Sequence, residues 1–476
     1  MSRFIVELQL VTWRRDPRLL ALLVAMTLAL SIASSWSTVA DIARQEAQVA
    51  AADVARQQWV GRGAAHPHSM AHFGDFAFRP AGPLARLDRG VQARLGKVVR
   101  VEGHRQGTPV FADAAQAGTV ARFATPDAAF LLQTVVPLLL IFLGATGLSS
   151  DRASGRLKLA LVQGVGARAL VGGHVAVLWG LSLGLLGLVV VASLLTSLVS
   201  GTTPVPMPGR LVGFVAVHAV YFAAVATGVV AAAVWFRSAR SALLALLAAW
   251  VVATAVMPRA TASVAAALYP LPSQDAFQAE LKAAQEAGPD GHNPQDMLVD
   301  KRRQEVLAEY GVESEDDLPI NFDGIAMQLG EDYGDRVWDE HDGALRERLG
   351  EQVRVGSLVA VINPFQAIDS VSMALAGTDL AHDLDFRQQA EGYRRRLIAQ
   401  LNHEHAYGGS RAGERGWTAS ADFYAGLAAF DYRPPEVAAG LRHRRLELAA
   451  LFAWVIGLIG LLSVGARRLE RGQLPC

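Results

Sequence analysis

Cysteine is almost absent from this chain of 476 residues, which contains only Cys476. No disulfide can therefore form within the chain, and packing alone must hold its soluble parts together. Lysine is nearly as scarce, with only Lys97, Lys158, Lys282 and Lys301. None of these lysines stands in the Gly-x-x-x-x-Gly-Lys-Ser/Thr frame of a phosphate-binding loop, so the sequence excludes ATP hydrolysis by that route.

Net charge is also absent, because 44 Lys and Arg residues balance 44 Asp and Glu residues. Basic residues crowd the short segments beside apolar runs, whereas the long polar segment after residue 262 is rich in Asp and Glu. Such an acidic segment is a poor ligand for nucleic acid, and we predict no nucleic-acid partner. Hydrophobic residues make up 52% of the chain and the mean hydropathy is +0.26, which indicates a protein partly in a membrane and partly in water.

Six apolar segments are long enough, or nearly so, to cross a bilayer. A hydrocarbon core about 30 Å thick needs about 20 apolar residues in a helix that rises about 1.5 Å per residue. The segments are Leu19–Val39, Ala128–Leu148, Leu170–Val199, Leu211–Phe236, Ala242–Ala262 and Glu447–Gly465. The sequence therefore predicts an all-α polytopic membrane protein with six transmembrane helices.

Basic residues flank only one set of span ends. They precede the first span, separate the second from the third and the fourth from the fifth, and follow the sixth: Arg14, Arg15, Arg18, Arg152, Arg156, Lys158, Arg168, Arg237, Arg240, Arg467, Arg468 and Arg471. By the positive-inside rule, both termini and residues 149–169 and 237–241 are cytoplasmic. A cleaved secretory signal is the alternative for the first span, but its apolar run exceeds the roughly 7–15 residues of a signal core.

This topology divides the chain into five parts. They are the N-terminal segment with the first span (1–40), a first extracytoplasmic insert (41–127), the second to fifth spans (128–262), a second extracytoplasmic insert (263–446), and the sixth span with a cytoplasmic tail (447–476). A short link rich in proline, Thr203–Pro208, joins the third and fourth spans on the outer side. Most of the soluble mass is therefore predicted to be extracytoplasmic.

The two inserts carry different structural signals. Apolar residues recur at helical spacing in the second insert, which predicts helices at Asp275–Ala287, Asn293–Tyr310, Asn321–Val355 and Asp383–His403. In the first insert, an Ala-rich polar stretch after Asp41 continues the first helix beyond the membrane, and residues 98–101 with 110–111 predict a small β-hairpin. Because amphipathic helices must bury their apolar faces, we expect the two inserts to pack together as one mostly helical domain.

Five segments of the chain carry a recognisable family pattern. They are Trp13–Arg18, His66–Pro80, Asp151–Gly164, Met257–Arg259 and Leu268–Pro272. With the six predicted spans, they give nearly the whole chain a resemblance to the permease subunits of ABC-2 type transporters, in particular the subgroup with large outer inserts after the first and fifth spans. The resemblance implies a multi-pass protein of the bacterial inner membrane.

In that family, the loop after the second span contains a short coupling helix that sits in a groove of the ATPase subunit. The usual pattern there is Glu-Arg-Glu-x-Gly-Thr-Leu, and the matching positions in this chain are Asp151, Arg152, Gly155, Arg156 and Leu157. The chain departs from the pattern where Ala153 replaces the second acidic residue and Arg156 replaces the threonine. From the residues alone, an ordinary basic connector explains this loop equally well.

The resemblance further implies that ATP and Mg²⁺ bind to a separate ATPase subunit, present in two copies, and that this chain holds no cofactor. A second permease subunit, identical or related, membrane lipid and a periplasmic protein complete the implied partners. We expect the chain to export a substrate, or extract it from the membrane, at the expense of that ATPase. The alternative is a non-transporting ABC-type machine that transmits ATPase motion to an extracytoplasmic partner. No motif supports an enzyme, so no catalytic residue is predicted.

Histidines outside the spans form one candidate metal site. His66, His68 and His72 make a His-x-His-x-x-x-His set, a spacing at which imidazoles can bind zinc or copper. Pro67 should break any helix that would align His68 with His72, so hydrogen-bonded packing histidines are favoured over a metal site. His104, His403 and His405 are further histidines of the two inserts.

His174 and His218 lie inside apolar spans, where an ionisable group is costly and usually faces a bundle interior or a water-filled path. They are the candidates for substrate contact, although His174 is near the cytoplasmic end of its span and can snorkel. Small residues in the third and fourth spans predict close packing of helices or subunits: Gly180, Gly184, Gly187, Gly213, Ala216, Ala219, Ala223 and Ala226.

Overall fold

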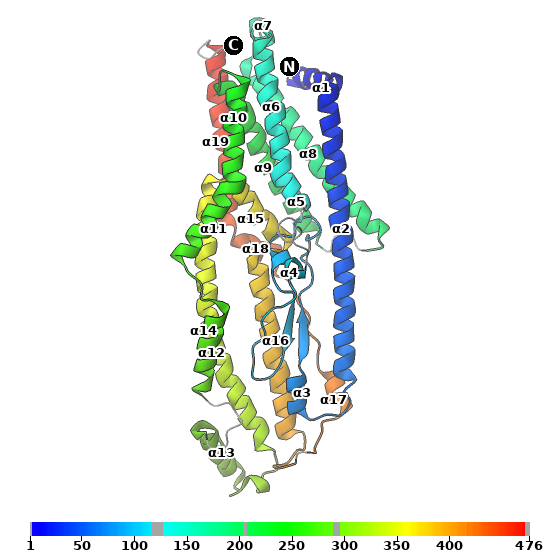
Figure 1. Ribbon diagram of the computed structural model, residues 1–476, viewed down its shortest axis with the longest axis vertical. Coiled ribbons are helices and arrows are strands. Elements are labelled where there is room, and N and C mark those ends of the chain that lie inside the picture. The colour runs from blue at the N-terminus through cyan, green and yellow to red at the C-terminus, as the bar shows by residue number, and fades with distance from the viewer. Residues whose placement is uncertain (1, 117–126, 203–206, 289–295, 415, 472–476) are drawn as a thin grey trace.

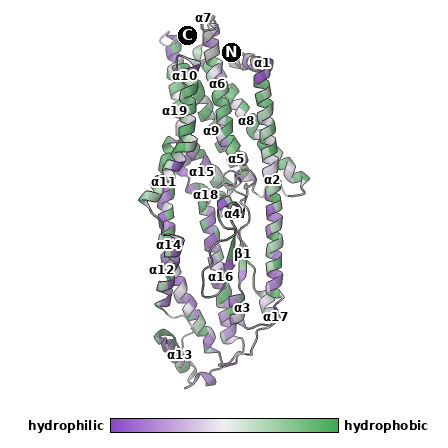
Figure 2. Ribbon diagram, viewed as in Figure 1, coloured by the Kyte–Doolittle hydropathy of each residue, from purple (hydrophilic) through white to green (hydrophobic). Residues whose placement is uncertain are grey.

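The computed structural model describes residues 2–116, 127–202, 207–288, 296–414 and 416–471. Cys476, most of the link Thr203–Pro208 and the first residues of the helix expected from Asn293 lie outside the described residues. The described part is an elongated, mostly helical molecule, and both ends of the chain lie at its apolar end (Figure 1, Figure 2). The opposite end is polar, as expected for a protein that is half in a membrane and half in water.

Six helical segments of the described chain are long and apolar enough to cross a membrane, which confirms the six predicted spans. In chain order they are α2 (Pro17–Val60), α5 (Ala128–Phe130) with the π-turn η2 (Leu131–Val135) and α6 (Val136–Ala153), α8 (Ala167–Val199), α9 (Pro208–Trp235), α10 (Ala239–Val251) with the π-turn η3 (Val252–Val256) and α11 (Met257–Leu268), and α19 (Arg445–Glu470). The chain is thus a multi-pass membrane protein. Its spans are helices, which satisfy their backbone N–H and C=O groups internally, as the interior of a bilayer requires.

The six spans differ in how deeply they are packed. In the most apolar window of each, 72% of the residues are buried in the second span and 56% in the fourth, against 11% in the first and 6% in the fifth. Hydroxyl groups join α2 to α8, since Ser34 Oγ donates to Val189 O over 2.9 Å and Thr38 Oγ1 lies 2.9 Å from Ser193 Oγ. The second and fourth spans therefore form the centre of the bundle, and the first and fifth leave apolar faces uncovered.

Glycine permits close approach at the centre of the bundle but not along the third span. A Cβ atom added to Gly144 would lie 2.3 Å from a methyl group of Val229. Helices α6 and α9 therefore approach closely there because Gly144 has no side chain. By contrast, no atom lies within 4 Å of a Cβ added at three glycines of α8: Gly180, Gly184 and Gly187. The small-residue stripe of the third span thus makes no close contact within the described chain.

The basic segments gather at one end of the bundle. The guanidinium of Arg152, at the end of α6, donates to Phe236 O at the end of α9 over 2.9 Å. Glu470, at the end of α19, accepts a 3.1 Å hydrogen bond from the backbone N–H of Ala167, which begins α8. The N-terminal helix α1 (Ser2–Arg15) and the short helix α7 (Arg156–Val162) lie at this end too (Figure 1). All four basic clusters identified in the sequence therefore share one side.

The polar half is built mostly from the second insert. Its helices are α12 (Gln274–Glu286), α13 (Met297–Tyr310), the short η4 (Glu315–Asp317), α14 (Phe322–Ile362), α15 (Pro364–Ala376), α16 (Leu380–Tyr407), α17 (Ala421–Gly426) and α18 (Val437–Arg442). The four helices predicted for this insert are confirmed, with ends that shift by a few residues. Side-chain caps explain two of the starts: Asp296 accepts from Leu298 N, and Asp379 accepts from His382 N.

The first insert adds α3 (Pro67–Phe73), β1 (Asp75–Phe78), η1 (Gln92–Arg94), β2 (Val98–Val101) and α4 (Asp113–Gln116). The two strands pair antiparallel, with Asp75 opposite Val101 and Phe78 opposite Val98. The small hairpin predicted for 98–101 with 110–111 is confirmed in part: an isolated antiparallel bridge joins Val98 to Val110, but the two-stranded sheet pairs Val98–Val101 with Asp75–Phe78. Gly103 and Gly107 indicate a turn that leads from Val98–Val101 to residues 110–111. The β-sheet instead forms with Asp75–Phe78, which precedes Val98–Val101 in the chain.

The two inserts share one core, as expected. Buried apolar residues from α2, α3, both strands, α16 and α17 pack together: Trp59, Met70, Ala71, Ala77, Val99, Val101, Phe386, Ala390, Tyr393, Leu397, Ile398, Leu401, Ala419, Tyr424 and Leu427. A bridge joins Ala65 of the first insert to Ala419 of the second, and buried Arg79 forms an ion pair with buried Asp383. Residues more than 300 positions apart thus form a single polar-half domain.

Two long helices run without interruption from the membrane half into this domain. Helix α2 has 44 residues and α14 has 41, which correspond to lengths of about 66 Å and about 62 Å. The C-terminal part of α14 is tied to the sixth span, since Ser357 Oγ donates to Glu447 Oε1 over 2.7 Å and Trp454 Nε1 donates to Val361 O over 2.9 Å. Both helices therefore fix the polar domain to the membrane bundle.

Candidate functional site

The segment between the second and third spans turns sharply at Gly155. This residue adopts φ 74°, in the left-handed region, where a side chain would be strained. The turn ends α6 at Ala153 and starts α7 at Arg156. Across it, Arg156 Nε donates to Asp151 Oδ1 over 2.8 Å. The ion pair and the glycine together set the direction in which α7 leaves the bundle.

Two further residues fix this segment to the membrane helices. Arg152 donates to the carbonyls of Phe236 and Val234, which satisfies acceptors left open at the end of α9. Leu157 is 1% exposed and belongs to the core of the membrane bundle. The five residues predicted for coupling are Asp151, Arg152, Gly155, Arg156 and Leu157. Arg152 and Leu157 attach the segment to the bundle, whereas Arg156, whose side chain is 57% exposed, pairs with Asp151 at the surface.

The surface that α7 offers comes from other residues. Leu159 is 57% exposed and Val162 77% exposed, and Lys158 lies between Leu157 and Leu159 on the exposed side. Helix α7 stands at the tip of the membrane half (Figure 1). We call Lys158, Leu159 and Val162 the α7 face. The sequence shows that Leu159 and Val162 are apolar and could pack against membrane helices or a partner, but which side of α7 faces outward depends on the burial of Leu157 in the bundle.

The two histidines within the spans are held by neighbouring helices. His174 Nδ1 lies 3.0 Å from Leu170 O, and its Nε2 lies 3.6 Å from Asp151 Oδ2. His218 is 0% exposed; its Nδ1 lies 2.8 Å from Phe214 O and its Nε2 lies 3.2 Å from Gln133 Nε2. His174 thus supports the turn before α7, and His218 joins α9 to the π-turn of the second span.

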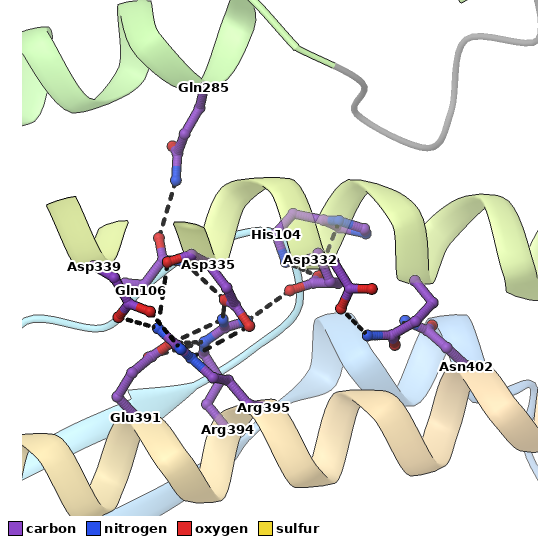
Figure 3. A network of polar contacts seen from close by, with 12 residues as sticks. His104, Gln106, Gln285, Asp332, Asp335, Asp339, Glu391, Arg394, Arg395 and Asn402 are labelled. Carbon is purple, nitrogen blue, oxygen red and sulfur yellow. Dashed lines mark hydrogen bonds and ion pairs between the residues drawn. The ribbon is translucent and has the colours of Figure 1, made fainter. Parts of the chain in front are cut away.

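A network of charged residues links both inserts in the polar domain (Figure 3). Its centre is Arg394 of α16, whose side chain is 1% exposed. The guanidinium pairs with Glu331 over 2.7 Å, with Glu391 over 2.9 Å and with Asp335. Although burial opposes its charge, these carboxylates raise the pKa of Arg394. Arg394 therefore stays charged and holds α14 against α16.

Other members of the network extend it to the first insert and to α12. Gln106 Nε2 lies 3.5 Å from Asp335 Oδ1, and Gln285 Nε2 donates to Gln106 Oε1 over 3.1 Å (Figure 3). Arg395, whose side chain is 31% exposed, pairs with Asp335 and Asp339. Burial raises the pKa of Asp335 to about 6, against the lowering effect of the two arginines.

Replacing Arg394 with methionine should destabilise the polar domain by about 3–5 kcal/mol, because it leaves buried Glu331 without its guanidinium partner and leaves Asp335 and Glu391 with Arg395 alone. Arg395→Met is the matched control, and its partly exposed pairs should cost less than about 1 kcal/mol. Unfolding of each purified variant by guanidinium chloride, followed by tryptophan fluorescence, measures both losses of stability. Equal losses for the two variants would contradict the central role of Arg394.

The same variants test the pH dependence. A carboxyl whose folded pKa is raised contributes stability below its unfolded pKa and loses it as pH rises through the folded value. For Asp335, that window runs from the ordinary aspartate pKa of 3.8 to about 6. Near pH 5 the carboxylates that lose Arg394 can take up protons. The free energy of unfolding that Arg394→Met removes should therefore be smaller near pH 5 than near pH 8.

The structure overturns the interpretation of Pro67 as a helix breaker. Pro67 is the first residue of α3, where a missing N–H costs nothing, and His66 caps the helix by accepting from His68 N over 3.2 Å. His68 and His72 therefore stand four residues apart on one helix face, with their Nε2 atoms 3.1 Å apart. Proline breaks a helix when it stands in the interior, but not when it is the first residue, as Pro67 is here.

A third histidine joins this pair from elsewhere in the chain. His104 lies in the turn after β2, and one ligand atom from each of His68, His72 and His104 lies within 4.8 Å of the others. We call these three residues the histidine cluster. The sequence does not indicate that His104 lies beside His68 and His72. The pairing of β1 with β2 brings the turn that contains His104 next to α3.

His66 takes no part in the histidine cluster. Its ring packs against that of His405, with centroids 4.6 Å apart. Burial lowers the pKa of His66, and burial together with His66 lowers the pKa of His405 to about 4. Both rings are therefore neutral at physiological pH, and they serve the packing of α3 on α16.

Comparison with known proteins finds a similarity in the second insert alone. Residues 276–433 match a family model described as "Domain of unknown function (DUF3526)". The matched range begins in α12 and ends before α18, so it includes Arg394 and the carboxylates paired with it and none of the six spans. No curated protein and no solved structure matches the chain.

Proposed function

We propose that this chain is the permease subunit of an ABC-2 type transporter, driven by a separate ATPase that binds ATP and Mg²⁺. In this proposal the chain lies in a bacterial inner membrane with both termini inside, and it exports a substrate or extracts it from the membrane. The observation that carries the proposal is the α7 face. A short helix that is fixed to the bundle and presents Leu159 and Val162 outward fits docking in a groove of a partner.

The attachment of α7 gives a route for mechanical coupling. A partner that moves the α7 face also moves Leu157, which is buried in the membrane core, and Arg152, which is bonded to the end of α9. Both contacts lead into the second and fourth spans, the two most buried of the bundle. ATPase motion would therefore reach the centre of the membrane half directly.

The uncovered spans support a paired arrangement. The first and fifth spans are the least buried in the described chain, at 11% and 6% of their most apolar windows. Lipid or a second permease subunit, identical or related, would cover these faces in a membrane. Two permeases with two ATPase subunits is the assembly that we propose.

The proposal predicts that the chain purifies from its native membrane with an ATP-binding subunit. The chain alone should hydrolyse no ATP, because no lysine of its sequence stands in a phosphate-binding loop. Measurement of ATPase activity before and after separation of the subunits checks both statements. ATPase activity that stays with the isolated chain would overturn the assignment.

A non-transporting machine is the second candidate, and the uninterrupted helices α2 and α14 favour it. Both pass from the membrane half into the polar domain and would carry ATPase motion to a periplasmic partner. Reconstitution in vesicles separates the two functions. Substrate-stimulated ATPase activity with measured translocation supports the permease, whereas ATPase activity that responds only to an added periplasmic protein supports the machine.

A further inference from the structure

We propose that the histidine cluster, His68, His72 and His104, is a binding site for a divalent transition-metal ion of the zinc class. All three donors are imidazole nitrogens, and such a set selects zinc or its neighbours over calcium and magnesium, which prefer oxygen ligands. The inference rests on the geometry of the polar domain and is independent of the proposed transport function.

The spacing of the first two ligands suits a tetrahedral ion. Zinc lies about 2.0–2.1 Å from each imidazole nitrogen, so two nitrogens of a tetrahedral site are about 3.3 Å apart. In the structure the Nε2 atoms of His68 and His72 are 3.1 Å apart, and their rings are nearly perpendicular at 86°. Two histidines at this interval on one helix face are a recurrent zinc-binding pair.

His104 is oriented toward the pair by its own backbone and by Glu331. Its φ of 62° is in the left-handed region, an unusual conformation that its surroundings must hold in place. Glu331 Oε1 accepts from the backbone N–H of His104 over 2.5 Å and lies 3.1 Å from its Nδ1. A proton held on Nδ1 by a carboxylate makes Nε2 the metal-binding nitrogen, and the ring of His104 lies 5.7 Å and 5.4 Å from those of His68 and His72.

The supporting carboxylate is itself held firmly. Glu331 is 5% exposed, and its second oxygen accepts from Arg394 over 2.7 Å. An ion in the histidine cluster would therefore join α3 and the turn after β2 to α14 and α16 through one chain of contacts. Three protein ligands leave a fourth position, and exposed His72 places the cluster at the surface, where water or a small ligand can reach it.

Zinc titration of the full-length chain tests the proposal. The protein is purified in detergent with an affinity tag that contains no histidine, stripped with a chelator, and titrated near neutral pH against a chromophoric chelator. We expect one Zn²⁺ per chain with submicromolar affinity. Co²⁺ in the same site should give the intense visible absorption of a four-coordinate ion.

Three variants sharpen the test. His72→Ala removes an exposed ligand and should abolish the submicromolar site and the Co²⁺ absorption while the protein remains folded. Glu331→Gln removes the carboxylate that supports His104, and with it the charge paired with Arg394, but keeps all three ligands; it should weaken Zn²⁺ binding by about 10–100-fold. His403→Ala, which changes an exposed histidine of α16 that packs against Tyr407, is the matched control and should bind Zn²⁺ as the unchanged protein does.

The outcomes are decisive in both directions. Submicromolar binding of one ion that disappears in His72→Ala and persists in His403→Ala establishes the site. Binding of Zn²⁺ only at high micromolar concentration, or binding that His72→Ala leaves unchanged, overturns it and leaves a hydrogen-bonded pair of histidines. Because folding of His72→Ala is checked by its melting temperature without metal, loss of binding cannot be mistaken for loss of structure.

Discussion

Aspartate in place of both Leu159 and Val162 should abolish association of the chain with the proposed ATPase subunit. These two side chains are 57% and 77% exposed and provide the apolar part of the α7 face. Two buried carboxylates in a partner groove would each need a counter-ion or a proton, and either requirement costs several kcal/mol. Co-purification from native membranes and ATPase activity of the purified complex measure the result.

The matched control changes two exposed apolar residues elsewhere. Met297 and Leu298 of α13 are 86% and 52% exposed and lie at the opposite end of the molecule (Figure 1). Their replacement with aspartate should leave the complex intact. The membrane level of each variant shows whether it folds. A Leu159→Asp, Val162→Asp protein that still purifies with active ATPase would show that α7 is only a connector.

The second large effect is an all-or-none labelling pattern. Cys476 is the sole cysteine, so Cys476→Ser supplies a cysteine-free background without disturbing a disulfide. In that background, a membrane-impermeant thiol reagent added to intact cells should label His403→Cys and not Ser154→Cys. Both positions are exposed, so solvent access within the protein does not distinguish them; only the membrane does.

Permeabilised cells provide the control for this experiment. Once the reagent can cross the membrane, Ser154→Cys should label as fully as His403→Cys. Labelling of Ser154→Cys from outside before permeabilisation would reverse the proposed topology and place the α7 face beyond the reach of a cytoplasmic ATPase. The experiment therefore tests the orientation on which the functional proposal depends.

The features that the sequence predicted well are those set by local composition. A run of about 20 apolar residues has few alternatives to a membrane helix, and the long second-insert helices carry both a periodic apolar pattern and capping residues such as Asp379. The common core of the two inserts also followed from their exposed apolar faces. In each case the signal lies within the element itself or in a face that must be buried.

The features that the sequence did not predict depend on contacts between distant segments. Nothing near Val98 indicates that its strand pairs along its length with Asp75–Phe78 while Val110 adds only an isolated bridge, because that choice depends on packing between distant segments. The same pairing carries His104 to His68 and His72. Leu157 and Leu159 are the same residue type two positions apart, yet only the bundle decides that the first is buried and the second exposed.

The unbroken course of α2 has a consequence for the size of any movement. A rigid rod about 66 Å long that tilts by about 5° at its membrane end displaces its far end by about 6 Å. A rearrangement of the first span too small to open a path in the bilayer would therefore shift the region around Trp59 and α3 by more than a helical turn. A small tilt of α2 at the apolar end of the molecule thus becomes a large displacement at the polar end, and the displacement grows with distance along the helix.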